Sequence, residues 1–325
     1  MSAALAALLL GALTACGSGS SAEDSGDSGS APRSSGAFPA KVKTKFGDVT
    51  VESKPQRVVA LGWGDAETAL ALGVQPVGQS DWLAFGGDGV GPWAKGLYDE
   101  SPQKIGTLEP EYEKIAALKP DLILDVKSSG DQTRYDTLSK IAPTVGVPEG
   151  GDQYKIAWQR QTTMISTALG VAGKGEKLIA DTQRKFTAAA EAHPEFKDRT
   201  VTVGSRTSAG WGAYVKGTDR VNFVQQLGFR NNPKVDAEAG AGFSVQVSEE
   251  NLQMLDADLV VVSPIGVDAK KISNDPLFRT LPAVEQGHSV VFDDQNISQA
   301  FATNSVLSVG YAIEKVVPLF ADAVK

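Results

Sequence analysis

The sequence has little of the chemistry on which most enzymes and metal proteins depend. It contains one cysteine and two histidines in 325 residues, which excludes an internal disulfide and argues against a zinc or manganese site built from imidazoles and thiolates. Neither His193 nor His288 has partners at the spacing of a catalytic triad. The glycines of 86–91 are not followed by the Lys-Ser or Lys-Thr pair of a phosphate loop, and no Gly-x-Ser-x-Gly elbow follows a strand. We therefore predict a protein that is not an enzyme and needs no cofactor.

Positive charge is also scarce. Lysine and arginine together number 31, against 39 aspartate and glutamate residues, so the formal net charge is −8. No basic stripe is present to neutralise a row of phosphates. This composition argues against nucleic acid as a partner.

The longest apolar run is confined to residues 1–16, which is too short to span a bilayer unaided. The run ends in small residues, as a secretory signal does, and its last four residues, Leu13-Thr-Ala-Cys16, resemble a bacterial lipoprotein signal. Cys16 would then carry a diacylglycerol, because it is the only cysteine and lies in a segment with no core in which to be buried. We expect the protein to be anchored to the outer face of the cytoplasmic membrane.

Residues 17–40 consist mostly of glycine, serine, alanine, acidic residues and proline, with almost nothing apolar, which predicts a flexible tether. About 285 residues remain to fold, enough for two medium lobes with separate cores. We predict an N-terminal α/β lobe over 41–151, a connecting helix over 152–173 and a C-terminal α/β lobe over 174–325.

A repeated pattern supports two similar lobes. Residues 113–124 and 250–261, which are 137 positions apart, share the spelling Glu-x-(Ile/Leu)-x-x-Leu-x-x-Asp-Leu-(Ile/Val)-(Leu/Val). In each copy the glutamate begins a short helix whose apolar residues face inward, and a buried β-branched strand follows. The pattern predicts that Glu113 and Glu250 occupy equivalent external places.

The rest of the chain alternates between strands and helices, which predicts mostly parallel sheets with helices on their faces. Asp65 is expected to be the N-cap of a helix that ends at Gly73. Other strands are expected at 45–51, 57–61, 143–147, 200–206, 259–263 and 289–292, and helices at 131–141, 152–169, 174–192, 220–227, 276–285 and 306–323.

Ligands of open α/β sheets bind beyond the carboxyl ends of the strands, and for two facing lobes those ends line a cleft. Flat aromatic faces with a cation suit a bulky ligand that carries amide surface and anionic oxygens. The candidate ligand-binding residues at strand ends or on adjacent loops are Trp63, Trp82, Phe85, Trp93, Lys127, Ser128, Ser129, Arg206, Trp211, Tyr214, Phe243 and Asn304.

Structural roles compete with these assignments. The loop aromatics could be core residues, and Lys127 to Ser129 could cap the next helix. Tyr154 is expected to pack on the long helix, and Arg220 to be a surface or cap residue. Acids in a first helical turn also gain from the helix dipole without any partner. The matched positions of Glu113 and Glu250 nevertheless favour docking on two arginines of a symmetric partner.

Four segments in order, residues 55–61, 67–78, 109–124 and 138–145, resemble the solute-binding lipoproteins of iron-siderophore ABC importers. Vitamin B12 and haem receptors share this plan, and the resemblance covers about residues 40–323. It implies two Rossmann-like lobes joined by one long helix, with a ligand cleft between them and little hinge motion. It also implies that Glu113 and Glu250 engage the dimeric permease.

In such relatives aromatics and arginines hold ferric hydroxamates or catecholates, and Arg206, Trp63, Trp82 and Phe243 match that description. The function we expect is capture of a ferric siderophore by a monomeric, membrane-anchored receptor, with the iron carried only as its chelate. A cobalamin or haem receptor is an alternative, although no histidine falls near the expected cleft. A surface enzyme or chelatase built on the same lobes is a further alternative.

Overall fold

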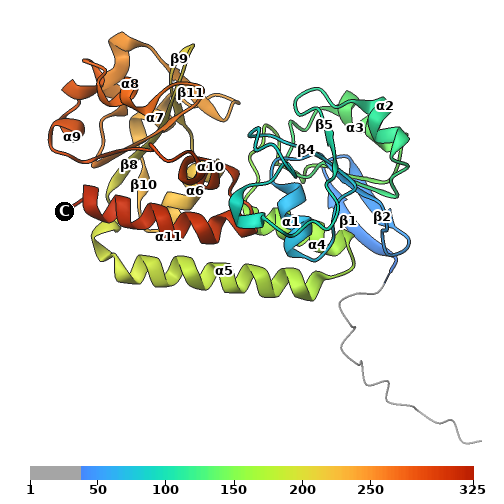
Figure 1. Ribbon diagram of the computed structural model, residues 1–325. Coiled ribbons are helices and arrows are strands. Elements are labelled where there is room, and N and C mark those ends of the chain that lie inside the picture. Colours follow the sequence, from blue (N-terminus) through green and yellow to red (C-terminus); the bar gives the residue numbers. More distant parts are fainter. Residues whose placement is uncertain (1–37) are drawn as a thin grey trace, which may run out of the picture. The chain divides into compact units, whose positions relative to one another are not determined.

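A computed structural model describes residues 38–325, which belong to one compact unit (Figure 1). The expected signal 1–16 with Cys16, and nearly all of the tether 17–40, lie outside the described residues. The described part has two main sheets, each accompanied by helices, and a separate two-stranded hairpin. We call the elements around the first sheet the N-terminal lobe and those around the second the C-terminal lobe. The predicted α/β fold class is confirmed.

The N-terminal sheet is entirely parallel. Its strands are β3 (Val58–Ala60), β4 (Gly78–Ser80), β5 (Gln103–Ile105), β6 (Leu122–Leu124) and β7 (Thr144–Val145), in the spatial order β5-β4-β3-β6-β7. Numbered along the chain, this is the 3-2-1-4-5 order of a doubly wound Rossmann sheet. The order reverses between β3 and β6, so the carboxyl ends of these two strands are the place where a ligand is expected.

The other N-terminal elements agree largely with the sequence prediction. They are the hairpin β1 (Ala40–Thr44) and β2 (Gly47–Val51), the helices α1 (Asp65–Ala71), α2 (Tyr112–Ala117) and α3 (Gln132–Ser139), and the 3₁₀ turn η1 (Pro92–Ala94). α3 starts as expected, because the Asp131 side chain accepts a hydrogen bond from the Arg134 backbone N–H at 2.7 Å. The prediction of Asp65 as the N-cap of α1 is wrong. Gly64 holds that position at a φ of 76°, and the buried Asp65 carboxylate instead accepts from the Val126 N–H at 2.8 Å.

The C-terminal sheet combines parallel and antiparallel pairs. It contains β8 (Thr200–Thr207), β9 (Gly210–Tyr214), β10 (Arg230–Asn231), β11 (Ser244–Val247), β12 (Leu259–Pro264) and β13 (Ser289–Val291). The order is β11-β9-β8-β12-β13, with β10 pairing parallel to the start of β8. β8, β12 and β13 are parallel as predicted, whereas β9 and β11 run antiparallel and were not foreseen.

The C-terminal lobe carries more short helices than the sequence indicated. Its helical elements are η2 (Pro194–Phe196), α6 (Asp219–Gln226), α7 (Pro233–Ala237), η3 (Glu249–Leu255), α8 (Ala269–Ser273), η4 (Phe278–Thr280), α9 (Pro282–Glu285), α10 (Gln295–Thr303) and α11 (Val306–Ala323). The expected helix 276–285 is divided into η4 and α9, because proline cannot continue a helix and Pro282 starts a new one. α11 has the predicted bounds.

Two helices connect the lobes along the chain, α4 (Trp158–Ala168) and α5 (Ala172–Ala192). The predicted helix over 152–169 is wrong at its start, because Gln153 and Tyr154 have positive φ values of 57° and 61°. The predicted break is present at Gly170, whose φ is 69°. The longer of the two helices is therefore α5, which lies side by side with α11 (Figure 1).

Side-chain alternation explains why each sheet is covered on both faces. Along β3, Val58 and Ala60 join one core cluster, whereas Val59 joins the cluster on the opposite face. Along β12, Leu259 and Val261 face one core of the C-terminal lobe, and Val260 faces the other. Strands buried on both faces require helices on both sides, which is the doubly wound arrangement.

The repeated pattern occupies equivalent places in the two sheets. Glu113 and Glu250 are each the second residue of a short helix, α2 or η3, and both are exposed. The strands that follow, β6 and β12, each pair with the first strand of their sheet. The second acid of the repeat also has one role in both copies. Asp121 accepts from the Arg57 N–H at 2.9 Å before β3, and Asp258 accepts from the Thr200 N–H at 2.7 Å at the start of β8.

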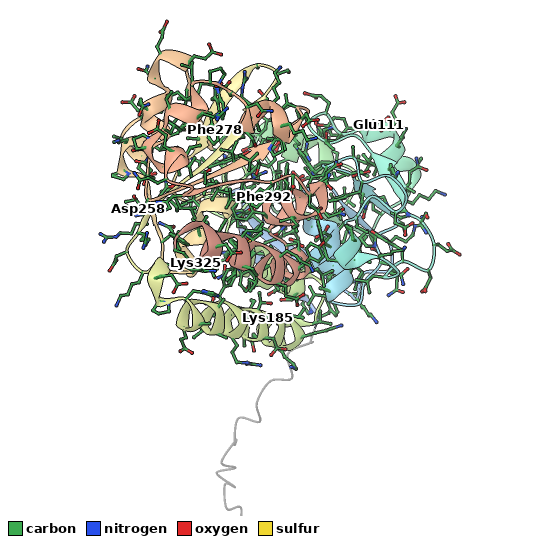
Figure 2. The ribbon with its side chains drawn as sticks, turned by 60° about the vertical axis from the view of Figure 1, so that its left-hand side comes forward. Glu111, Lys185, Asp258, Phe278, Phe292 and Lys325 are labelled. Carbon is green, nitrogen blue, oxygen red and sulfur yellow. The ribbon has the colours of Figure 1, made fainter. Side chains whose placement is uncertain are left out.

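Figure 2 shows Glu111, beside Glu113, and Asp258 at the periphery of the molecule in that view. Both side chains are exposed. Within residues 38–325, no helix combines the length and the apolar character needed to cross a membrane.

Candidate ligand-binding site

A cavity of about 1060 Å³ is lined by residues of both lobes. From the N-terminal lobe come loop residues that follow β3, β4 and β6, and from the C-terminal lobe come the ends of β9, β12 and β13 with the first turn of α6. Strand ends therefore line the cavity, as the sequence analysis predicted. Of the candidate ligand-binding residues, those that line it are Trp63, Trp82, Lys127, Tyr214 and Phe243.

The N-terminal wall is built at the switch point of the sheet. The backbone N–H of Trp63, after β3, donates to the carbonyl of Lys127, after β6, at 2.8 Å. The Trp63 ring lies 5.5 Å from that of Trp82, whose indole N–H donates to the Leu61 carbonyl at 2.9 Å. Trp82 in turn makes an edge contact with Tyr154 at 5.5 Å. The three rings form a continuous aromatic surface in fixed orientations.

Tyr154 was expected to pack on a helix, and this expectation is wrong. It precedes α4, and its backbone N–H donates to the carbonyl of Ser128 at 3.0 Å. The positive φ of 61° places it in a turn rather than a helix, and its side chain lines the cavity. The signal available in the sequence was Gly150-Gly151 just before it, which is typical of a loop.

The C-terminal wall carries aromatic rings and a cation. Tyr214, the last residue of β9, stacks with Phe243 at 6.3 Å. The guanidinium of Arg220 lies 4.4 Å from the Tyr214 ring, within the range of a cation–π contact. Arg220 thus takes the place that the sequence analysis gave to Arg206, and its assignment to the general surface is corrected.

An ion pair closes the inner side of the cavity and joins the lobes. Lys127 donates from Nζ to Oδ2 of Asp219, the first residue of α6, at 2.8 Å. Both side chains line the cavity and both are buried. Burial raises the pKa of the Asp219 carboxyl, and the neighbouring Lys127 ammonium opposes that rise. Lys127 is therefore neither a helix cap nor a free cation.

Three polar atoms in the cavity wall have no hydrogen-bond partner among the described residues. They are Oδ1 of Asp219, Nε of Arg220 and Oγ of Ser263, and all are buried. Buried polar atoms are normally paired with protein, water or ligand. This wall can therefore both accept and donate hydrogen bonds toward a bound molecule.

Arg206 does not line the cavity, although it is the last residue of the predicted strand. Along β8, Val203 faces the core that contains α6, and Arg206 lies on the opposite face. Its guanidinium lies 5.3 Å from the ring of Trp211, and its Nη1 donates to the Thr207 carbonyl at 2.7 Å. Trp211 is likewise a core residue, stacked on Phe278 at 5.3 Å. The placement of both in the cleft is corrected.

Phe85 and Trp93 lie outside this cavity because they pack against each other, with ring centroids 5.7 Å apart. The Trp93 indole N–H donates to the carboxylate of Glu67 at 2.7 Å. That carboxylate also accepts from the hydroxyl of Ser305 in the other lobe. The two aromatics are thus part of a contact between the lobes rather than of the ligand wall.

Ser128, Ser129 and Asn304 are also placed elsewhere. Carbonyls of Ser128 and Ser129 accept backbone hydrogen bonds from the turn at 153–154, and α3 is capped by Asp131 rather than by either serine. Asn304 is buried at the end of α10 with a φ of 46°, a conformation that asparagine tolerates better than most residues.

Arg134 fixes one border of the cavity. Its guanidinium forms a two-point ion pair with Asp125, at 3.0 and 2.6 Å, and donates to the carbonyls of Thr107 and Leu108 at 3.2 and 3.3 Å. Leu108 lines the cavity. The buried arginine therefore holds the loop before α2 in place.

Several lining residues were missed. They lie at or just after the ends of correctly predicted strands, but the sequence analysis did not consider them. Ser263, Pro264 and Ile265 end or follow β12, and Phe292 and Asp293 follow β13. The strand-end rule, applied to these two strands, would have found them. Within residues 38–325, no group of three or more His, Cys, Asp or Glu side chains is arranged to hold a metal ion.

Comparison with family models matches residues 58–296 to a model described as periplasmic binding protein. The chain belongs to the periplasmic binding protein family. Family membership confirms the predicted solute-binding protein in place of an enzyme. It also confirms the resemblance inferred from the four sequence segments.

Two curated relatives from Bacillus subtilis (strain 168) match nearly the whole chain. A probable siderophore-binding lipoprotein is 29% identical over 300 residues, which cover 87% of this chain and 86% of the relative. An iron(3+)-hydroxamate-binding protein is 28% identical over 298 residues, which cover 89% of this chain and 88% of the relative.

Solved structures of the family have the same fold. PiaA of Streptococcus pneumoniae in complex with ferrichrome has a TM-score of 0.75 and 28% identity, and the match covers 88% of this chain and 98% of that one. A periplasmic solute binding protein of Mycobacterium smegmatis has a TM-score of 0.75 and 27% identity, with 88% and 99% covered.

Proposed function

We propose that the protein captures a ferric siderophore outside the cytoplasm and delivers it to the permease of an ABC importer. The observation that carries the proposal is the cavity of about 1060 Å³ between aromatic walls at the strand ends of two sheets. Ligand sites commonly measure about 300–1,000 Å³, so this volume suits a bulky chelate. The names of the relatives and the ferrichrome complex of PiaA support the choice of a siderophore.

The iron would remain wrapped by its chelator, and the protein would supply shape, stacking and polar contacts. Trp63, Trp82, Tyr214 and Phe243 offer the flat apolar faces for such a ligand. Both histidines lie outside the cavity wall, and His193 instead contacts Glu195 at 2.8 Å. The cavity wall therefore offers no histidine as an axial ligand for haem.

The partner would be a dimeric permease that receives the exposed carboxylates of Glu113 and Glu250. Neither carboxylate has a hydrogen bond or an ion pair within residues 38–325, so both are available to arginines of such a partner. The receptor would act as a monomer held at the outer face of the cytoplasmic membrane by a lipid on Cys16. Mass spectrometry of the mature N-terminus tests the anchor, and an unmodified Cys16 would contradict it.

The ligand is tested by tryptophan fluorescence of the purified full chain. Ferric siderophores should quench the emission in a saturable way, because Trp63 and Trp82 line the cavity. Replacing both by phenylalanine should remove most of the quenching, whereas Trp93→Phe, outside the cavity, should leave it. Saturation by haem or cobalamin, with no response to any ferric siderophore, would contradict the proposed function.

A further inference from the structure

The charges that line the cavity cancel. Three are cationic, Lys127, Arg220 and Lys270, and three are acidic, Asp219, Asp268 and Asp293. Lys127 is already engaged by Asp219 at 2.8 Å, so it offers little countercharge to a ligand. Transfer of a strongly anionic chelate from water to a wall with no net positive charge would cost more desolvation free energy than the contacts with the wall recover.

The unpartnered polar atoms limit further which chemical groups the ligand can carry. Asp219 and Ser263 are only 8% and 2% exposed, and Oδ1 of the former and Oγ of the latter have no partner within residues 38–325. The same holds for Nε of the neighbouring Arg220. A carboxylate oxygen accepts hydrogen bonds, a guanidinium nitrogen donates them, and a hydroxyl can do both. A ligand that satisfies all three must present both hydrogen-bond donors and acceptors, and amide groups supply both.

Part of the border of the cavity is apolar. Leu108, Phe243 and Ile265 line it and remain 68%, 43% and 44% exposed. Exposed apolar side chains around a pocket are typical of a site that contacts an apolar ligand surface. A chelate with hydrocarbon or peptide periphery fits this border better than one with charged arms.

We propose that the cavity selects uncharged, amide-bearing ferric chelates of the trihydroxamate class, with Asp219, Arg220 and Ser263 as the polar contacts. This inference rests on the proposed siderophore function. Three hydroxamates carry one negative charge each and neutralise Fe³⁺, whereas three catecholates leave an excess of three negative charges. The two classes therefore differ in the net charge that the cavity wall must accommodate.

The test compares two probes on the full chain by tryptophan quenching. Ferrichrome, an uncharged trihydroxamate with peptide N–H groups, should bind at least about 100-fold more tightly than ferric enterobactin, a tris-catecholate, because opposing like charges are costly. Tighter binding of the catecholate would overturn the inference and leave the proposed function standing. Failure of every ferric chelate to bind would overturn both.

Charge reversal in the wall gives a second, independent readout. Asp293→Lys should raise the affinity for ferric enterobactin about tenfold and leave ferrichrome within about threefold, because only the anionic chelate gains from the added charge. Glu285→Lys makes the same change on α9, outside the cavity wall, and should alter neither affinity. Equal effects of the two substitutions would contradict selection by wall charge.

The polar contact is tested with paired serines. Ser263→Ala should weaken ferrichrome binding about tenfold, since it removes one hydrogen bond to the ligand. Ser205 lies directly beside Ser263 on β8 but does not line the cavity, so Ser205→Ala is the matched control. Unchanged ferrichrome affinity in folded Ser263→Ala would rule out this contact.

Discussion

Asp65 holds three segments of the N-terminal lobe together from a fully buried position. Its carboxylate accepts from the Val126 N–H at 2.8 Å and from the Gln161 side chain of α4 at 2.6 Å. The same Gln161 amide donates to the carbonyl of Trp63 at 2.9 Å. Asp65 thus fixes the loop that presents Trp63 to the cavity, even though it does not touch the cavity itself.

This carboxyl should make stability depend on pH. Burial raises its pKa from 3.8 to about 6, against the lowering effect of its hydrogen bonds with Gln161 and Val126. The folded state therefore binds the proton more tightly than the unfolded state, so the contribution of Asp65 is greatest below about pH 4 and is lost as pH rises to about 6. A shift of this size corresponds to about 3 kcal/mol.

Urea unfolding of the wild type and of Asp65→Asn between pH 4 and 7 measures this contribution. The free energy of unfolding of the wild type should fall relative to that of Asp65→Asn as pH rises, because asparagine cannot titrate. Asp48→Asn, at an exposed site on β2, should follow the wild type. Parallel curves for the wild type and Asp65→Asn would disprove the buried titration.

At this scale the sequence located some site residues and not others, for a physical reason. Trp63 and Lys127 were found because both directly follow parallel strands, where chain position determines spatial position. Arg206 was misplaced because residues of a strand alternate between faces, and the face of β8 that adjoins the cavity is set by its neighbours. Arg220 was missed because it lies beyond the unforeseen strand β9.

Among the elements, α2 and η3 present the matched acids in the same way. Glu113 and Glu250 are exposed at the second position of each helix, and the buried residues that anchor them, Ile115 and Leu252, are those that the repeat indicated. One difference could not be predicted from the sequence: the first helix is α, whereas the second is 3₁₀. The repeated pattern therefore determines the position of the acid, but not whether its helix is α or 3₁₀.

Charge reversal at both acids should separate docking from ligand binding. The Glu113→Lys/Glu250→Lys variant should bind its chelate with unchanged affinity, because neither residue lines the cavity. Uptake of radioactive iron by cells that carry this variant should fall at least about tenfold, since two charge pairs with the permease would become repulsive.

The double variant Glu100→Lys/Glu285→Lys, with two exposed acids changed elsewhere, controls for net charge. It should transport iron normally. Normal uptake by the Glu113/Glu250 variant, or loss of its chelate binding, would contradict the assigned docking role.

Over the whole molecule, side-chain contacts hold the two lobes together around the cavity. Besides Lys127 with Asp219, the amide of Gln299 donates to the Leu83 carbonyl at 3.0 Å, and Lys155 donates to the Ala241 carbonyl at 2.9 Å. Separating the lobes would break these bonds. No sequence pattern pointed to them, because each joins residues more than 80 positions apart whose proximity exists only after folding.

Ser305 makes the most deeply buried of these connections. It is the N-cap of α11, since its hydroxyl oxygen accepts from the Ser308 N–H at 3.1 Å, and the same hydroxyl donates to Glu67 in the other lobe. Burial raises the pKa of Glu67, and the hydrogen bonds from Ser305 and Trp93 oppose that rise. The hydroxyl therefore stabilises both a helix end and the buried carboxyl group of Glu67.

Ser305→Ala should lower the free energy of unfolding by about 2–4 kcal/mol, because it removes the cap and leaves Glu67 short of a donor. Asp294→Ala removes only the cap of α10 and should cost about 1 kcal/mol. Urea unfolding near pH 7 compares them. Equal losses would show that the bond between the lobes contributes nothing to stability.

The loops at the cavity border have a consequence for the release of cargo. Leu108 lies five residues before Glu113, on the loop that leads into α2, and Phe243 lies seven residues before Glu250, with β11 between it and η3. A permease that binds both carboxylates would displace the chain segments that border the cavity and retain the chelate. We therefore expect the chelate to be released by displacement of these two border segments, without a large rotation of one lobe against the other.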